Sequence, residues 1–473
     1  MPKDYFKVSE ISCIADLPVG AHIHLIGVCG VAMGQLALAL KKMGFCVSGS
    51  DKEFYEPMGS LLKNSGINLY EGYSSTNLDQ TAELVIIGNA ISYDNPEVST
   101  VESKKIPYSC FPQALFECLI AGKHSVVVAG THGKSTTTGL IAHLFEANSK
   151  YPSFFVGGVL GNSDTSFKVE AGMTSIVEGD EYDSAFFAKV PKFVFYKPNT
   201  FIINALEFDH ADIYPNLAAI DQEFIKQINQ LNVNDTLITC SDHTHISEVI
   251  KQAHPKCRQL TFGCNAEADM QIVNREPKET FQIVTLKYKG LSFKIELPLP
   301  GVYNARNLAV AALVGLQQGL SPNEIANAAK TYKSVRRRFD IRLRTEQLVV
   351  VEDFAHHPTA IAEAIQATRE SFPNMKICAV FEPRSNTSRR AVFHQQYLDA
   401  FKQANQVILC SIKAKENEKD LHLLNTTKLC SDLSSQGISA EALDNADEIY
   451  QKITSQDNQN TVILIMSNGS FGG

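Results

Sequence analysis

Short apolar runs alternate with helical patterns along most of the chain. The runs have strand length, and many of them end at a glycine or an acidic residue; they cover 22–26, 45–51, 84–88, 125–129, 175–178, 200–204, 348–352, 377–382, 407–409 and 461–466. Helical patterns with apolar positions three or four residues apart follow, for example at 35–43 and 359–368. Alternation of this kind with short connections is typical of parallel sheets covered by helices. We therefore expect an α/β fold with doubly wound sheets.

The alternation falls into three segments, and the length of 473 residues also suggests about three domains. We expect a Rossmann-like domain over residues 1–122 and a central P-loop domain with a parallel sheet over 123–335. A second Rossmann-like α/β domain is expected over 336–473, because the basic run at Arg336–Arg338 breaks the pattern there.

Composition excludes several classes of protein. Apolar residues make up 44% of the chain, charged residues 20%, and the net charge is −8, which argues against nucleic acid or an anionic membrane as the main partner. No apolar run approaches the ~18 residues of a membrane span, and the first residues lack the apolar core of a secretory signal. The 11 cysteines include no C-x-x-C pair, as expected for reduced thiols. We expect a cytoplasmic protein without nucleic acid and without membrane insertion.

The clearest chemical signal is the loop Gly130-Thr-His-Gly-Lys-Ser135, which follows a predicted strand and opens a helix. Its glycines let backbone N–H groups approach phosphate oxygens, and the helix N-terminus adds a positive dipole end. Lys134 is expected to reach the β- and γ-phosphates and Ser135 to ligate Mg²⁺. The loop is shorter than the common G-x-x-x-x-G-K-[ST] pattern, because Val128 stands at the position of its first glycine. A chance Gly-Lys-Ser in a strand–helix connection is the alternative.

A second glycine loop follows the first predicted strand, with Gly27, Gly30 and Gly34. The dinucleotide fingerprint G-x-G-x-x-G is broken here, because Cys29 and Ala32 stand at its second and third glycine positions. The loop therefore favours a nucleotide diphosphate at the helix N-terminus over a nicotinamide cofactor. Glycines used only for turn geometry are the remaining alternative.

Two candidate metal ligands, Glu178 and His210, follow strands of the central segment. The carboxyl ends of parallel strands meet at one edge of a sheet, so both side chains can lie near a triphosphate and hold a second divalent ion. Alternatively, Glu178 is a helix cap or a solvated acid and His210 an ordinary, partly buried histidine. The acids beside Glu178 are expected to be capping or solvated groups: Asp180, Glu181 and Asp183.

Three further groups lie near or beyond the second boundary. Arg336–Arg338 is either a solvated run or a source of charge for phosphoryl transfer. The pair His356–His357 favours a nucleotide contact or a turn over a metal site. Arg384, Asn386 and Thr387 follow a strand and offer donors that suit a substrate carboxylate, with a structural turn as the alternative.

Together these motifs resemble the Mur ligase family, with the markers in family order along almost the whole chain. The carriers are the short P-loop, Glu178 in E-G-D-E-Y-D, His210 in F-D-H, the Asn304/Asn307 pair, Arg337 and the turn 353–358. The resemblance implies an ADP-forming ligase that uses ATP and two Mg²⁺ ions. In such a reaction ATP converts a carboxylate into an acyl phosphate, and an amine then attacks it to form an amide.

The resemblance also implies roles for individual residues. Catalytic roles fall to Lys134, Glu178, His210 and Arg337, and the metal ligands would be Ser135, Glu178 and His210. The implied ATP-binding residues are Gly130, Thr131, His132, Gly133, Lys134, Ser135, Thr136, Asn304, Asn307, Arg337, Asp353 and His357. A UDP-sugar would contact Gly27, Gly30, Met33, Gly34, Ser50, Asp51, Asn89 and His132, and a peptide would contact Arg384, Asn386 and Thr387.

Two reactions compete within the family. One joins the tripeptide L-alanyl-γ-D-glutamyl-meso-diaminopimelate to UDP-N-acetylmuramate in peptidoglycan recycling, and the other adds L-alanine to the same acceptor in peptidoglycan synthesis. The stretches 27–34, 178–187 and 381–387 resemble the first kind of enzyme, and Arg384-Ser-Asn-Thr387 stands where the alanine ligase carries His-Arg-Tyr-Thr. A regulator that binds nucleotide and UDP-sugar without catalysis is the alternative of a different class.

Overall fold

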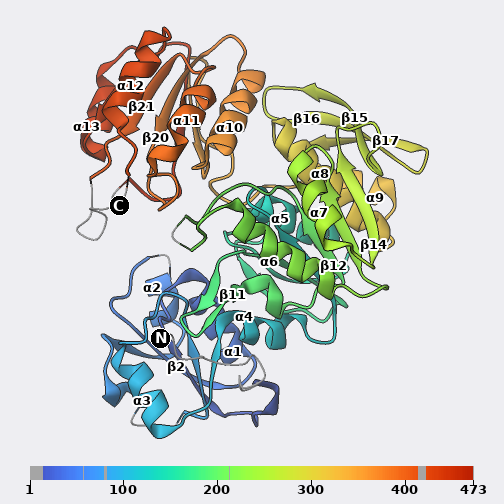
Figure 1. The fold of residues 1–473 in the computed structure, drawn as a ribbon, viewed down its shortest axis with the longest axis vertical. Helices are drawn as coiled ribbons and strands as arrows, with labels where there is room; N and C mark the ends of the chain where they lie inside the picture. The colour runs from blue at the N-terminus through green and yellow to red at the C-terminus, as the bar shows by residue number, and fades with distance from the viewer. Residues whose placement is uncertain (1–13, 57, 79–81, 212, 414–421, 472–473) are drawn as a thin grey trace.

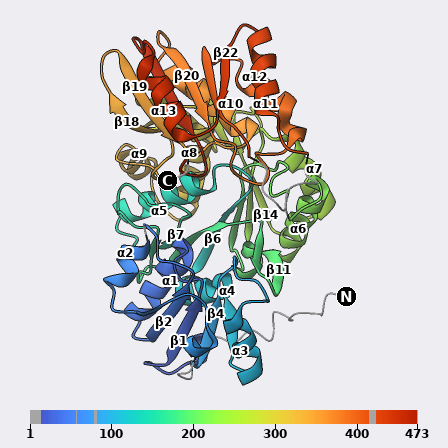
Figure 2. The same cartoon turned by 90° about the vertical axis from the view of Figure 1, so that its left-hand side faces the viewer.

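Three lobes follow one another along the long axis of the computed structural model, each built around its own sheet (Figures 1 and 2). The structure describes residues 14–56, 58–78, 82–211, 213–413 and 422–471. In this part of the chain, no helix has the length and apolar content needed to cross a membrane. The cysteines described there are free thiols, as the spacing predicts.

The N-terminal lobe holds a parallel sheet in the order β3-β2-β1-β4-β5. Its strands are β1 (His22–Ile26), β2 (Cys46–Asp51), β3 (Asn68–Glu71), β4 (Leu84–Ile87) and β5 (Tyr108–Cys110). Its helices are α1 (Val31–Lys42), α2 (Met58–Lys63), α3 (Pro96–Lys104) and α4 (Phe111–Leu115). Strand order reverses between β1 and β4, which makes the carboxyl end of β1 the usual place for a ligand.

The central lobe contains a ten-stranded sheet in the order β17-β16-β15-β14-β13-β12-β6-β9-β7-β8. Its strands are β6 (His124–Ala129), β7 (Ser153–Phe155), β8 (Phe167–Lys168), β9 (Thr174–Gly179), β12 (Thr200–Ile203), β13 (Thr236–Cys240), β14 (Arg258–Gly263), β15 (Met270–Pro277), β16 (Gln282–Tyr288) and β17 (Leu291–Leu297). A separate antiparallel hairpin joins β10 (Asp183–Ala185) and β11 (Ala188–Pro191).

The sheet of the central lobe is parallel from β7 to β14, as the sequence predicts, but it continues into an antiparallel meander. In this meander β16 buries every second residue, which is the pattern of a strand with one covered face. The helices of this lobe are α5 (Lys134–Ala147), α6 (Leu217–Gln230), α7 (Thr244–Ala253), α8 (Val302–Gln317) and α9 (Pro322–Ala329).

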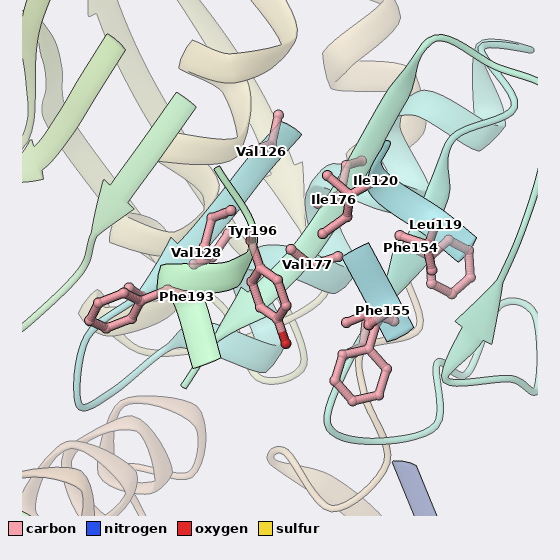
Figure 3. Packing of buried hydrophobic residues seen from close by; sticks show 14 of the residues in the cluster. Leu119, Ile120, Val126, Val128, Phe154, Phe155, Ile176, Val177, Phe193 and Tyr196 are labelled. Carbon is pink, nitrogen blue, oxygen red and sulfur yellow. The ribbon is translucent and has the colours of Figure 1, made fainter. Parts of the chain in front are cut away.

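Strands β6 and β9 are neighbours inside this sheet and are almost completely buried. Figure 3 shows Val126 and Val128 of β6 beside Ile176 and Val177 of β9. Uninterrupted apolar strands of this kind fit a parallel sheet with helices on both faces. Both strands end at the loops that carry the predicted phosphate and metal residues, so a rigid core positions them.

The C-terminal lobe holds a sheet in the order β18-β19-β23-β20-β21-β22. Its strands are β18 (Asp340–Arg344), β19 (Leu348–Asp353), β20 (Lys376–Phe381), β21 (Gln406–Cys410), β22 (Ser439–Leu443) and β23 (Thr461–Met466), and its helices are α10 (Pro358–Ser371), α11 (His394–Ala400), α12 (Thr426–Ser435) and α13 (Ala446–Ser455). Only the β18–β19 pair is antiparallel in the described part of this sheet.

The three lobes do not each have a separate apolar core. One continuous cluster of buried side chains runs through the N-terminal and central lobes, whereas the C-terminal lobe has clusters of its own. Phe208 and Tyr303 of the central lobe pack against the C-terminal core. The predicted three-part α/β fold is confirmed. The boundaries at 122/123 and 335/336 remain predictions, and the described strands of each sheet lie within one predicted segment.

Candidate functional site

The loop between β6 and α5 needs its two glycines. Gly130 has φ +111°, and a Cβ there would lie 2.5 Å from the carbonyl oxygen of Ala205. Gly133 has φ +77°, and a Cβ there would lie 2.6 Å from Oδ1 of Asn307. Side chains at these positions would combine a strained backbone with a clash. The loop is therefore packed tightly between the end of β12 and the first turn of α8.

Lys134, the first residue of α5, is held by acidic side chains. Its Nζ donates to the carbonyl oxygen of Gly130 at 2.9 Å and to Oε2 of Glu181 at 2.8 Å, and lies 3.9 Å from Oδ1 of Asp180. Burial alone would lower the pKa of Lys134, but the carboxylates of Glu181 and Asp180 outweigh it and raise that pKa. Lys134 is thus a charged, oriented donor.

The expectation that Asp180 and Glu181 are capping or solvated acids is wrong. Both side chains are mostly buried, and Asp180 accepts a hydrogen bond from Lys192 at 2.9 Å. Burial would raise the pKa of Glu181, but the positive charges of Lys134 and His210 lower it. Sequence reasoning missed these residues because a run of acids after a strand also fits a solvated turn. Asp183 pairs with Lys189 at 2.6 Å.

Glu178 ends β9 and faces the hydroxyl that opens α5. Ser135 Oγ donates to Glu178 Oε2 at 3.1 Å, and the backbone N–H of Gly157 donates to Oε1. Burial, together with the negative charge of Asp180, raises the pKa of Glu178 from 4.5 to about 7. A buried carboxylate beside a hydroxyl offers the oxygen ligands that Mg²⁺ prefers. These two residues therefore fit one magnesium ion.

His210 lies near Lys134 and contacts Glu181, not Glu178, with which it is predicted to share a metal ion. Its backbone is left-handed, with φ +53°. Its Nε2 lies 3.3 Å from Oε1 of Glu181, and its ring centre lies 5.1 Å from that of Tyr182. Burial would lower the pKa of His210, but the hydrogen bond and charge of Glu181 raise it. That His210 shares an ion with Glu178 remains a prediction.

One cavity of about 760 Å³ collects most of the predicted nucleotide residues. A ligand site of this size is ordinary for a small molecule. Its lining comes from the central and C-terminal lobes and includes 131–136, Gly157, Gly158, Val159, Glu178, Asp180, His210, Asn304, Asn307, 336–338, Asp353 and His356. Gly130, the first residue of the loop, and the buried His357 are not among the lining residues. Glu178 and His210 both line the cavity, although they contact different partners.

The first two turns of α8 are tied to the start of α5 by two asparagines. Thr137 Oγ1 donates to Asn307 Oδ1 at 3.0 Å, and Asn307 Nδ2 donates to Asn304 Oδ1 at 3.3 Å. Asn304 Nδ2 donates to the carbonyl oxygen of Pro300 at 2.7 Å. The pair shares one helix face, as the sequence predicts. These bonds fix the approach of α8 to the cavity.

At the joint between the lobes, Arg337 and Arg338 point to different partners. Arg337 Nε donates to Oε1 of Glu352 at 2.6 Å, within the C-terminal lobe. Arg338 Nη2 lies 3.4 Å from Oγ of Ser135, and its guanidinium lies 4.6 Å from the ring centre of Phe354. Arg338 is therefore the arginine that approaches the phosphate loop, whereas the predicted Arg337 lines the cavity from its edge.

Asp353 and His357 anchor the turn that leads into α10. Asp353 accepts hydrogen bonds from the backbone N–H groups of Phe339 and Ala355, each at 2.7 Å, and burial raises its pKa. His357 is the N-cap of α10, and its Nδ1 lies 3.1 Å from Oε2 of Glu207. Glu207 follows β12 and had no role assigned from the sequence.

The predicted UDP-sugar residues gather at the carboxyl ends of β1, β2 and β4. The backbone N–H of Gly27 donates to the carbonyl oxygen of Ser50 at 2.8 Å, and that of Cys29 donates to Oδ2 of Asp51 at 2.7 Å. The Ser50 hydroxyl is buried and donates to Glu97 at 2.5 Å, so it points inward. Gly30 caps α1, Met33 and Gly34 are buried within it, and Asn89 is exposed. A ligand role for these residues remains a prediction.

The predicted peptide residues follow β20. Arg384 is 57% exposed, and its Nη1 lies 3.6 Å from Oε1 of Glu382. Asn386 is also exposed, whereas Thr387 is buried. Thr387 Oγ1 accepts a hydrogen bond from the backbone N–H of Ala211 at 3.2 Å, which joins the C-terminal lobe to the central lobe. Arg384 and Asn386 are therefore free to face a ligand, and Thr387 serves the interface.

Comparisons with known proteins extend over almost the whole chain. Three family models match: "Mur ligase family, catalytic domain" over 22–122, "Mur ligase middle domain" over 128–315 and "Mur ligase, glutamate ligase domain" over 337–469. The UDP-N-acetylmuramate--L-alanyl-gamma-D-glutamyl-meso-2,6-diaminoheptandioate ligase of Escherichia coli (strain K12) is 33% identical, with 95% of this chain and 96% of the relative covered.

Two further relatives define the range of similarity. The UDP-N-acetylmuramate--L-alanine ligase of Clostridium botulinum (strain Okra / Type B1) is 29% identical, with 95% of each chain covered. The crystal structure of a murein peptide ligase from Psychrobacter arcticus 273-4 matches with a TM-score of 0.70 at 26% identity, with 96% of each chain covered.

Proposed function

Because the chain belongs to the Mur ligase family, we propose that it joins L-alanyl-γ-D-glutamyl-meso-diaminopimelate to UDP-N-acetylmuramate in peptidoglycan recycling. The chain is an ATP-dependent ligase that forms an amide bond. Both substrates and ATP are cytoplasmic metabolites in this proposal, so the enzyme would act in the cytoplasm.

The choice of amine is supported by two observations. The tripeptide ligase of E. coli is 33% identical to the chain, against 29% for the alanine ligase of C. botulinum, at nearly equal coverage. The C-terminal lobe also presents Arg384, whose exposed guanidinium can pair with a peptide carboxylate. The single carboxylate of L-alanine lies next to the reacting amine. A tripeptide carries further carboxylates, and cations that pair with them must lie farther from the reacting amine.

The cavity supports phosphoryl transfer. ATP supplies the activation that a carboxylate needs, since phosphorylation gives an acyl phosphate that an amine can attack. Lys134 is charged and lies at the helix N-terminus, so it can hold the β- and γ-phosphates once they replace Glu181 as its partner. Arg338 reaches the same loop and can stabilise charge on the transferring group.

Two magnesium positions are proposed around this loop. Ser135 and Glu178 would hold one ion, since their oxygens already lie 3.1 Å apart. His210 would contribute, together with Glu178, to a second position once its Nε2 gives up the 3.3 Å contact with Oε1 of Glu181. Bound ions would neutralise charge on the phosphates and fix their orientation.

The separate core of the C-terminal lobe suits a moving part. This lobe carries Arg384, and it contacts the central lobe through the hydroxyl of Thr387 and through Phe208 and Tyr303. Its closure would bring the amine toward the activated carboxylate and exclude water, which would otherwise hydrolyse an acyl phosphate. His132 in the phosphate loop would face the acceptor.

A competition assay tests the proposed reaction. L-Alanine and the tripeptide are offered at equal concentration with UDP-N-acetylmuramate, ATP and Mg²⁺, and the products are separated by mass. We expect the tripeptide product and release of ADP that requires both acceptor and amine. Incorporation of L-alanine would instead assign the synthetic reaction, and nucleotide binding without ADP release would indicate the regulator.

A substitution of Arg384 tests whether this residue binds the tripeptide. Arg384→Ala should raise KM for the tripeptide about tenfold or more, because a charge-assisted contact is worth roughly 1.5–3 kcal/mol. The matched control Arg344→Ala removes an exposed arginine of β18 that pairs with Glu279, and it should leave KM unchanged. Equal effects of both variants would remove Arg384 from the peptide site.

A further inference from the structure

Two histidines and a glutamate from separate parts of the chain converge at the joint between the central and C-terminal lobes. His132 belongs to the phosphate loop, Glu207 follows β12, and His357 caps α10. Nε2 of His132 and Nδ1 of His357 each lie 3.1 Å from Oε2 of Glu207. The three ligand atoms lie within 4.8 Å of one another.

We propose that His132, Glu207 and His357 form a binding site for a transition-metal dication of the Zn²⁺ type, separate from the magnesium positions. Two imidazoles and one carboxylate are a common ligand set for zinc, whereas Mg²⁺ prefers oxygen ligands alone. With bonds of about 2.0–2.1 Å, tetrahedral ligands lie about 3.3 Å apart. The two distances of 3.1 Å to Glu207 Oε2 need only a small expansion to admit such an ion, and the two histidine nitrogens lie within 4.8 Å of each other.

His357 approaches Glu207 with the ring nitrogen that also faces the start of α10. Its Nδ1 lies 3.1 Å from Oε2 of Glu207 and 3.4 Å from the backbone nitrogen of Thr359. A proton shared between His357 and Glu207 is the competing explanation for the short contact, and a metal titration separates the two.

The surroundings of the site are also favourable to positive charge. Asp209 and Glu363 lie close enough to His132 to act on it electrostatically. The side chains are mostly shielded, with exposed fractions of 16% for His132, 24% for Glu207 and 7% for His357. The hydroxyl of Thr359 donates to the same Oε2 atom of Glu207 at 2.7 Å, which holds this carboxylate oxygen toward the two histidines.

An ion at this site would connect two lobes. His132 and Glu207 belong to the central lobe and His357 to the C-terminal lobe, so the bound metal would hold the lobes together. Since His132 and His357 are also predicted ATP contacts, the metal would slow turnover rather than support it. The expected ligand is therefore an inhibitory dication.

The test measures metal binding directly and does not depend on the proposed reaction. The full chain, freed of metal with a chelator, is titrated with Zn²⁺ alone in competition with a chromophoric chelator. We expect one tightly bound Zn²⁺ per chain, and Glu207→Gln should weaken binding at least about tenfold. The matched control His394→Gln removes a histidine that pairs with Asp432 at 2.8 Å outside the site and should bind like the wild type.

Cobalt distinguishes this site from adventitious binding by thiols. The Co²⁺ form should show the strong visible bands of tetrahedral nitrogen and oxygen ligation, and these should disappear in Glu207→Gln. A thiolate charge-transfer band, equal affinity in Glu207→Gln and wild type, or no stoichiometric Zn²⁺ at all would each overturn the proposal. If the chain binds zinc as expected but its zinc-free form does not form the amide with ATP and Mg²⁺, that would count against the proposed function alone.

Discussion

Replacing Glu178 by glutamine should make the ligand-free protein more stable while it destroys activity. In the absence of metal, burial and Asp180 raise the pKa of Glu178 from 4.5 to about 7. A raised carboxyl pKa means that the folded state prefers the protonated form. The stability that this carboxyl group contributes is therefore fully present below pH 4.5 and is lost as the pH rises through about 7. Glutamine stays neutral and avoids this loss.

The magnitude follows from the interval between the two pKa values. At about 1.4 kcal/mol for each pKa unit, an ionised Glu178 costs about 3 kcal/mol of folding free energy at pH 8. The glutamine amide can keep both local contacts, because its oxygen can accept from Gly157 and its nitrogen can donate to Ser135. For a domain of the size of the central lobe, the gain corresponds to a rise in Tm of several degrees.

The assay is thermal unfolding in the presence of a chelator, at pH 8 and again at pH 5. Glu178→Gln should unfold at a higher temperature than the wild type at pH 8, and the difference should shrink at pH 5. Its ADP release with Mg²⁺ should fall ~100-fold or more, because a metal ligand is lost.

Glu181→Gln is the matched control, because this equally buried carboxylate is stabilised in its charged form by Lys134 and His210. The same chemical change should therefore destabilise the protein here, by about 3–5 kcal/mol. A lower Tm for Glu178→Gln than for the wild type at pH 8 would refute the reasoning about its burial.

Three further outcomes are expected. Lys134→Ala should abolish ADP release and leave UDP-sugar binding by calorimetry largely intact, and normal turnover would contradict the phosphate role. Gly130→Ala should lower the Tm and nucleotide affinity together, since its Cβ would lie 2.5 Å from the Ala205 oxygen; an unchanged Tm would argue against the packed loop. Arg338→Met should reduce kcat more than Arg336→Met, whose wild-type arginine is 60% exposed, and equal rates would exclude Arg338 from the reaction.

Much of the fold was predictable because buried parallel strands leave a strong local signal. The runs at 125–129 and 175–178 are apolar at nearly every position, and they are the central strands β6 and β9. The meander of β15–β17 was not predicted. Its strands are half exposed and amphipathic, so their alternating residues give a weaker signal than an uninterrupted apolar run.

The phosphate loop was predictable for a similar reason, since its glycines, lysine and hydroxyl occupy a few adjacent positions. Partners from distant segments were not. Glu181 lies within an acidic run, where sequence alone does not tell which carboxylate turns inward, and the structure shows that it meets Lys134 and His210. Arg338 rather than Arg337 approaches Ser135, and adjacent arginines in a basic run give no sequence signal of which one turns toward the loop.

The contact between Lys134 and Glu181 has a consequence for selectivity among anions. Because the lysine already has a buried carboxylate at 2.8 Å, an incoming phosphate gains only the difference between two anionic partners. A single phosphate or sulfate offers little advantage over that carboxylate. A triphosphate that also brings metal ions and contacts the loop backbone offers much more. Glu181 therefore remains the partner of Lys134 until a nucleotide that makes all of these contacts binds.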